Sequence, residues 1–271
     1  LKERLITILV TPFMTCAARL PVYTIIIALV IPAKKFMGID YRAIALLGMY
    51  LLGFVTALVS ALILKKTIKQ KTKSFLIMEL PPYKKPLFGY DFKLMLGKVW
   101  EFINGAGRVI LAVSIILWFL SYLGPKQNPD QYVATDVHLH DSYLAKMGKA
   151  IEPVVAPLGY DWKMGVSIIS SFAAREVFVG TMATLYSLDD DVEEGPIVDK
   201  MRNDVKPNGE KVFTLATGLS VLVYYAFAMQ CVSTIAVVYR ETRSIKWTTL
   251  QLVGMTGLAY LAAFLVYQFF R

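Results

Sequence analysis

Two cysteines, a methionine and a glutamate are the side chains of this sequence best suited to metal chemistry. Cys16 and Cys231 lie within apolar stretches, Met229 precedes Cys231 by two residues, and neither cysteine has a CxxC neighbour. Thiolates and thioethers bind soft or borderline metals, whereas oxygen ligands alone suit Mg²⁺ or Ca²⁺. A path lined by both thiols, thioethers and the carboxylate of Glu176 therefore suits a borderline divalent ion such as Fe²⁺ better than Na⁺ or K⁺. The alternative is that the cysteines are small apolar core residues.

Three charged residues lie near the middle of apolar segments: Arg19, Arg175 and Glu176. An arginine at the centre of a membrane helix costs about 2.5–3.5 kcal/mol, so these side chains must face a polar cavity or one another. Arg175 and Glu176 are neighbours on the chain and point about 100° apart on a helix, which disfavours a pair. An Arg19–Glu176 pair across two segments is one expectation. These charges either take part in gating or substrate passage, or they form a buried pair that only holds the helices together.

The two arginines end similar motifs, Thr-Cys-Ala-Ala-Arg at 15–19 and Ser-Phe-Ala-Ala-Arg at 171–175. Each motif falls near the middle of a predicted span, and the two spans are expected to run in opposite directions. Inverted repeats whose interrupted segments meet at the bilayer midplane are typical of transporters.

Composition supports a polytopic membrane protein. The chain is 56% hydrophobic and 18% charged, which excludes disordered, collagen-like and disulfide-stapled secreted proteins and disfavours an ordinary soluble enzyme. We expect an all-α integral membrane bundle with two inverted gate-type repeats and about six spans, namely 5–31, 42–64, 104–123, 163–187, 213–238 and 249–270. Pro12 and Pro21 predict that the first is kinked, broken or re-entrant.

The net charge of +9 fits the positive-inside rule better than nucleic-acid binding. With six spans, the basic residues concentrate on the side of both termini, the 65–98 loop with its nine lysines, and the 188–212 loop. We therefore expect both ends of this chain to face the cytoplasm and no nucleic-acid partner.

Three parts follow from this arrangement: a first gate repeat at 1–123, an external loop at 124–162 and a second gate repeat at 163–271. The first repeat includes a basic linker with an amphipathic helix (65–103), which lies at the membrane surface or packs on the bundle. The acidic run at 189–194 is expected to be solvated, and His138 and His140 to be bystanders, since an HxH pair lacks a third ligand.

Motifs of nucleotide binding and catalysis do not occur in the sequence. It contains no GxxxxGK[ST] loop, no GxGxxG opening a helix, no HExxH and no GxSxG. We expect a transporter portion rather than an enzyme.

Several segments together resemble the ferrous iron transport protein B family. Residues 12–23 resemble its first gate motif, 173–186 its second, 78–83 its cytoplasmic linker, and 228–234 with 240–242 its late transmembrane segment.

The resemblance implies the permease portion of a prokaryotic Fe²⁺ importer in the cytoplasmic (inner) membrane. It implies that Cys16 and Cys231 lie on the metal path, where we also place Glu176, Met182 and Met229, and that Arg19 and Arg175 belong to the gate motifs. Expected partners are the transported Fe²⁺, an N-terminal G domain that would bind and hydrolyse GTP, a small cytoplasmic accessory protein and a second copy of the chain. No permanently bound cofactor is expected, and GTP would act only through the G domain.

Two alternatives remain at this point. One is a cation-coupled transporter of an organic solute such as a nucleoside, which midplane arginines would suit. The other is a non-transporting membrane scaffold or sensor whose basic 65–98 loop binds a partner.

Overall fold

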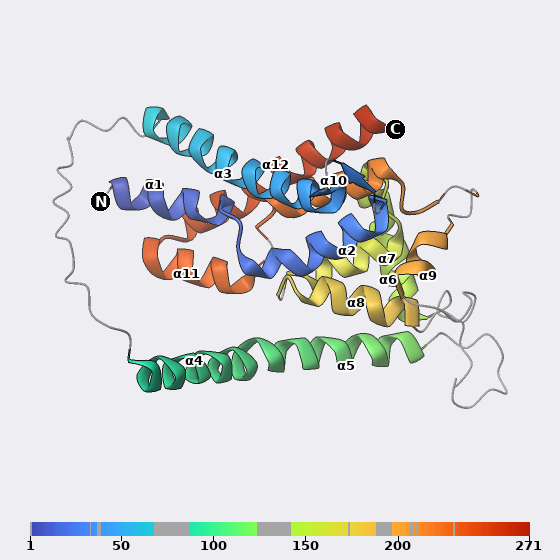
Figure 1. The fold of residues 1–271 in the computed structure, drawn as a ribbon, viewed down its shortest axis with the longest axis horizontal. Coiled ribbons are helices and arrows are strands. Elements are labelled where there is room, and N and C mark those ends of the chain that lie inside the picture. Colours follow the sequence, from blue (N-terminus) through green and yellow to red (C-terminus); the bar gives the residue numbers. More distant parts are fainter. Residues whose placement is uncertain are drawn as a thin grey trace.

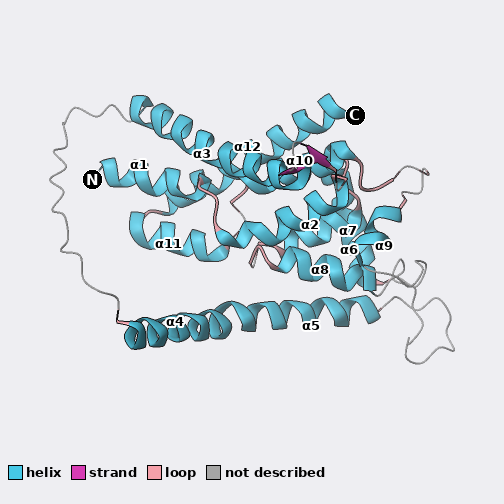
Figure 2. Ribbon diagram, viewed as in Figure 1, coloured by secondary structure: helices cyan, strands magenta, loops and turns pink. Residues whose placement is uncertain are grey.

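Helices make up almost all of the described chain. The structure is a computed structural model that describes residues 2–32, 34–36, 39–67, 87–123, 142–172, 174–187, 197–205, 209, 211–229 and 231–271. Figure 2 shows the helices and one small hairpin, in which strands β1 (Lys35–Phe36) and β2 (Ile39–Asp40) pair antiparallel. The predicted all-α membrane bundle is confirmed.

The first predicted span is broken in its middle, as its prolines indicated. It consists of α1 (Lys2–Val10), the short helix η1 (Thr11–Phe13), an extended stretch, the short helix η2 (Ala17–Arg19) and α2 (Leu20–Val30). Pro12 and Pro21 both stand in the first turn of a helical segment, the position that tolerates a residue without an N–H. The second span is the unbroken α3 (Tyr41–Thr67).

A second long helical stretch precedes the central part of the chain. It comprises α4 (Phe88–Phe102), a π-helical turn η3 (Ile103–Gly107) and α5 (Arg108–Tyr122). The turn and α5 coincide with the third predicted span. In Figure 1 the two helices follow one line along one edge of the bundle, and α5 packs against α6 and α8.

The fourth predicted span, 163–187, does not cross the bundle. After α6 (Tyr143–Val155) and η5 (Ala156–Leu158), the chain forms α7 (Trp162–Ser170) and then turns back as α8 (Val177–Ser187). In one straight helix Lys163 and Tyr186 would lie about 34 Å apart, yet the Lys163 Nζ is 4.5 Å from the centre of the Tyr186 ring. The segment is therefore a re-entrant hairpin, and the prediction that it spans was wrong.

The hairpin changes the expected topology. The remaining helices are α9 (Ile197–Asn203), the broken pair α10 (Leu215–Phe227) and α11 (Val232–Thr242), and α12 (Ile245–Phe270). Among the described residues, four segments are long and apolar enough by themselves to cross a membrane: Arg4–Val30, Tyr41–Thr67, Leu215–Thr242 and Ile245–Phe270. The helices α4 and α5 together also run the length of the bundle (Figure 1). Because α7–α8 turns back, the chain ends lie at opposite ends of the bundle (Figure 1), not on the same side as six crossings required.

Two contacts support this placement of the chain ends. Near the N-terminus, Arg4 forms an ion pair with Glu241 at the end of α11. Near the C-terminus, the Tyr267 ring lies so close to Gly159 that a Cβ there would clash with it. Gly159 also has φ +85°, a conformation that favours glycine.

Two similar segments of the chain do run in opposite directions, but they are not the two that the sequence predicted. Both α1–α2 and α10–α11 are crossings with a break in the middle, and each is followed by an unbroken helix of similar length, α3 or α12. The two broken crossings run in opposite directions (Figure 1). The first half of each packs on the second half of the other, α1 on α11 and α2 on α10. The Ala-Ala-Arg similarity instead joins a crossing to a hairpin.

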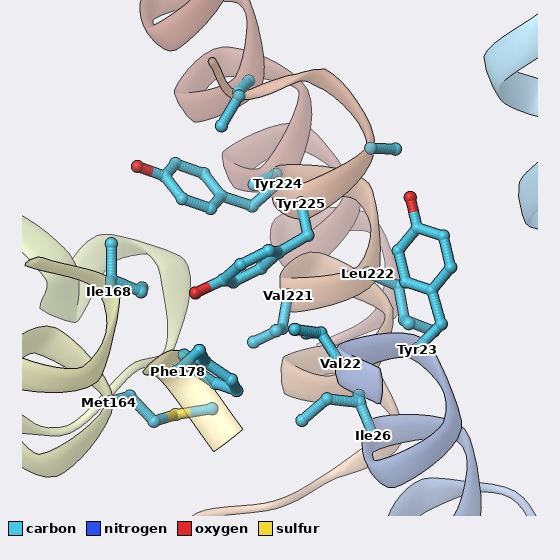
Figure 3. Close-up of a cluster of buried hydrophobic side chains, with 14 of the residues drawn as sticks. Val22, Tyr23, Ile26, Met164, Ile168, Phe178, Val221, Leu222, Tyr224 and Tyr225 are labelled. Carbon is cyan, nitrogen blue, oxygen red and sulfur yellow. The ribbon is translucent and has the colours of Figure 1, made fainter. Parts of the chain in front are cut away.

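The core forms where the hairpin and the two broken crossings meet. Figure 3 shows α2, α7, α8 and α10 converging through Val22 and Tyr23, Met164, Phe178, and Tyr225. The Phe178 and Tyr225 rings pack against each other at a centroid distance of 4.9 Å, with their planes tilted by 60°. The outer faces of α3 and α12, in contrast, expose large apolar side chains, as expected of surfaces that face lipid.

Candidate ion path at the helix breaks

Each cysteine lies in the break of one crossing, directly before the second half-helix. Cys16 precedes η2 and Cys231 precedes α11, and both have extended backbone conformations. Cys16 is exposed and Cys231 half-buried. Both belong to a Met-x-Cys sequence, Met14-Thr15-Cys16 and Met229-Gln230-Cys231. The two thiols therefore occupy matching positions in two crossings of opposite direction.

Arg19 is buried at the first break and binds backbone carbonyl groups. Its Nη2 donates to the Pro12 oxygen at 2.9 Å, and its Nη1 donates to the Phe13 oxygen at 3.4 Å. These carbonyls belong to η1, which ends the first half of this crossing. The expected pair between Arg19 and Glu176 does not form: neither side chain has an ion-pair partner among the described residues.

Arg175 likewise binds backbone carbonyl groups, at the break between α10 and α11. This buried side chain comes from the turn of the hairpin, and its guanidinium donates to the Tyr225 oxygen at 3.1 Å and to the Ala228 oxygen at 2.7 Å. Arg175 therefore donates to carbonyls at the end of α10, which receive no hydrogen bond from an N–H group within the helix. The two similar motifs place their arginines on comparable backbone groups of different crossings.

Further contacts bring the three interrupted segments together. The Val232 N–H donates to the Phe172 oxygen at 3.2 Å, which joins the α10–α11 break to the hairpin turn. The Tyr225 hydroxyl donates to Ser171 Oγ at 3.1 Å. Arg19 and Arg175 lie near each other, and both lie near the buried Tyr23.

The remaining predicted path residues differ in their surroundings. Glu176 is half-buried beside Arg175 in the hairpin turn. Met182 and Met229 are almost completely buried within the apolar core. Among the described residues, no three side chains of the His, Cys, Asp and Glu types come together as a metal cluster. An ion at the breaks would therefore also need water or backbone carbonyls as ligands.

Some predicted features lie outside the described residues. They are the acidic run at 189–194, the pair His138 and His140, and the linker motif at 78–83.

Comparison with known proteins shows the family of the chain. A family profile described as "Nucleoside recognition" matches residues 104–245, and one described as "Ferrous iron transport protein B C terminus" matches 46–101. A protein of Leptospira biflexa named Fe(2+) transporter FeoB is 43% identical over 268 residues, and one of Leptospira interrogans serovar copenhageni with the same name is 39% identical over 273. Both alignments cover 98% of this chain. The chain belongs to the ferrous iron transport protein B family.

Members of the ferrous iron transport protein B family can be much longer than this chain, which spans 39% of each Leptospira relative. A Porphyromonas gingivalis relative, 30% identical over 98% of this chain and 34% of its own length, is named as a fusion of Fe(2+) transport protein A with FeoB. No solved structure shows significant similarity to the chain.

Two features of this family member's site were missed by the sequence analysis. The Met-x-Cys repeat is present in the sequence and pairs residues 14–16 with 229–231. The Ala-Ala-Arg similarity pairs 15–19 with 171–175 instead. The carbonyl groups bound by Arg175 lie 50 and 53 residues away along the chain, and no local signal announces such a contact.

Proposed function

We propose that this chain forms the permease portion of an Fe²⁺ importer and that the ion passes through the helix breaks. The observation that carries the proposal is the placement of Cys16 and Cys231 at matching positions in two oppositely directed, broken crossings. Breaks at matching positions of inverted repeats are where transporters bind their substrates. The relatives named as Fe(2+) transporters align with nearly the whole chain, which disfavours the solute-transporter and scaffold alternatives.

In this mechanism the thiols replace water ligands of the ion near the midplane. Fe²⁺ accepts thiolate, thioether and carboxylate ligands, and each thiol must lose its proton to bind. Cys16 and Cys231 act first, with Glu176 as an oxygen ligand at the hairpin turn. Met182 and Met229 are buried and would join only after the packing at the breaks rearranges.

Other parts of the proposal concern the complete protein. An N-terminal G domain would bias the breaks through its GTP state, a small accessory protein would act on the cytoplasmic side, and two or more copies would assemble. The fused relative of Porphyromonas gingivalis supports the accessory protein. We place the protein in the prokaryotic cytoplasmic membrane, with the N-terminal end of this chain and its lysine-rich 65–98 stretch inside.

The test is anaerobic Fe²⁺ influx into proteoliposomes that hold the complete transporter and an iron-quenched dye. Cys16→Ser and Cys231→Ser, alone and together, replace a thiolate by a poor ligand for Fe²⁺ at nearly equal volume. We expect each to reduce influx by tenfold or more, about 1.4 kcal/mol, with the double variant lowest. Met147→Leu, which removes an exposed sulfur on α6, is the control and should transport normally. Full influx through the double variant would rule out the thiol path.

A further inference from the structure

The two buried arginines bind the same kind of backbone group in each broken crossing. Phe13 and Ala228 each lie three residues before the cysteine of their break. The Phe13 carbonyl accepts from Arg19 and the Ala228 carbonyl accepts from Arg175. A second carbonyl nearby, that of Pro12 or Tyr225, accepts from the same guanidinium. The arrangement therefore recurs although the arginines come from different elements.

These carbonyls are suited to binding a cation. The C-terminal end of a helix carries a partial negative charge, and unwound carbonyls at such ends coordinate cations in transporters built from inverted repeats. Here each carbonyl pair faces a guanidinium that has no carboxylate partner among the described residues. Arg19 is 1% exposed and Arg175 6%. Each positive charge is thus held in the protein by carbonyl oxygens.

Arg19 also has unused hydrogen-bonding capacity beside its present position. Its Nε and the hydroxyl of Tyr23 are both buried without a hydrogen bond of good geometry, although the two side chains already lie close to each other. The Tyr23 oxygen is an available acceptor for a guanidinium that has left the Pro12 and Phe13 carbonyls. Arg19 can therefore move toward Tyr23 when it leaves those carbonyls.

We propose that Arg19 and Arg175 are tethered cations, which occupy the carbonyl sites of the two breaks and must withdraw before a transported cation can bind there. The proposal rests on the proposed function for the identity of that cation as Fe²⁺. The guanidinium groups thereby keep abundant monovalent ions out of the breaks while no Fe²⁺ is bound. Withdrawal of Arg19 is assisted by Tyr23.

The experiment compares Arg19→Ala and Arg175→Ala with the unaltered complete transporter. Fe²⁺ influx into proteoliposomes is measured anaerobically in K⁺ medium and in medium where the much larger N-methylglucamine ion replaces K⁺. In the variants K⁺ can enter the vacated carbonyl site, so we expect it to raise the apparent KM for Fe²⁺ by about tenfold, or about 1.4 kcal/mol. The unaltered transporter should show no such difference.

A matched control separates this effect from the loss of any helix cap. Arg42 is half-buried and donates to the Ile31 and Ala28 carbonyls at the end of α2, away from the breaks. Arg42→Ala should leave influx insensitive to K⁺. Where an alanine variant fails to fold, Arg→Gln at the same position replaces it, because the uncharged amide keeps much of the side-chain volume.

A second readout does not depend on transport. The unfolding temperature of purified Arg19→Ala and Arg175→Ala should rise when guanidinium ion is added at low millimolar concentration, and that of Arg42→Ala should not. The proposal is overturned if the variants carry Fe²⁺ with no more sensitivity to K⁺ than the unaltered protein, or if guanidinium stabilises none of them. An unaltered transporter without Fe²⁺ influx would instead contradict the proposed function, and guanidinium binding would still test the carbonyl sites.

Discussion

At the scale of single residues, buried hydroxyl groups differ in whether they have a partner. The Tyr225 hydroxyl donates to Ser171 and ties α10 to the hairpin turn. The hydroxyl of Tyr23, equally buried, forms no hydrogen bond of good geometry, although the Arg19 side chain lies beside it. A buried hydrogen bond contributes about 1 kcal/mol, whereas an unpaired buried polar group lowers stability. The Tyr225 hydroxyl therefore stabilises the fold, whereas the Tyr23 hydroxyl does not.

Replacing these tyrosines by phenylalanine tests that distinction. Tyr225→Phe should lower the free energy of unfolding by about 1 kcal/mol. Tyr23→Phe should leave it unchanged or raise it, while it slows Fe²⁺ influx, because Arg19 loses the acceptor toward which it withdraws. Denaturant titration in detergent micelles measures the first quantity and the proteoliposome assay the second. Equal destabilisation by the two substitutions would show that the Tyr23 hydroxyl has a structural partner.

At the scale of elements, one carboxylate joins both ends of the re-entrant hairpin to the segment that follows it. Asp204 accepts from Lys163 Nζ at 3.1 Å, at the start of α7, and from the Tyr186 hydroxyl at 2.5 Å, at the end of α8. The Lys163 and Asp204 side chains are 4% and 13% exposed. Removing one member of a buried ion pair is far more costly than removing an exposed one. The mouth of the hairpin is therefore fixed electrostatically.

Asp204→Leu should lower the free energy of unfolding by about 3 kcal/mol, since it leaves a buried ammonium group without this carboxylate. Tyr186→Phe removes only one hydrogen bond and should cost about 1 kcal/mol. Adding Lys163→Met to Asp204→Leu should recover much of the loss, because the buried charge that lost this carboxylate is removed. The three variants are compared by denaturant unfolding. A double variant no more stable than Asp204→Leu alone would show that the charge was not the cause.

The elements also show which structural features the sequence could reveal. Pro12 and Pro21 predicted the first break because they constrain the backbone locally. No glycine or proline marks residues 228–231, and that break depends on Arg175 and Phe172 from a distant segment. Hydropathy detected residues 163–187 as apolar but could not separate one crossing from two short helices that pack on each other. The cysteines and arginines were recognised by type, whereas their equivalence required the fold.

At the scale of the whole molecule, the hairpin removes one crossing and so reverses every later segment. Helix α9, with Lys200 and Arg202, lies at the end opposite the N-terminus, and Arg240, Arg243 and Lys246, around the junction of α11 and α12, lie at the N-terminal end. The excess of positive charge on the N-terminal side becomes smaller, but α3 ends there with Lys65 and Lys66, and α4 begins there (Figure 1). We therefore still expect the N-terminal end inside, and the C-terminal residue outside.

Reporter fusions to the complete transporter test this orientation directly. A fluorescent protein that matures only in the cytoplasm, inserted between residues 68 and 86, should fluoresce. Alkaline phosphatase, which is active only outside, should be active when fused after Arg271. When the chain is instead cut after Arg243, between α11 and α12, the phosphatase should be inactive and the fluorescent protein bright, because one crossing has been removed. If fusions after Arg271 and at 68–86 report the same side, residues 163–187 cross the membrane after all and the hairpin is excluded.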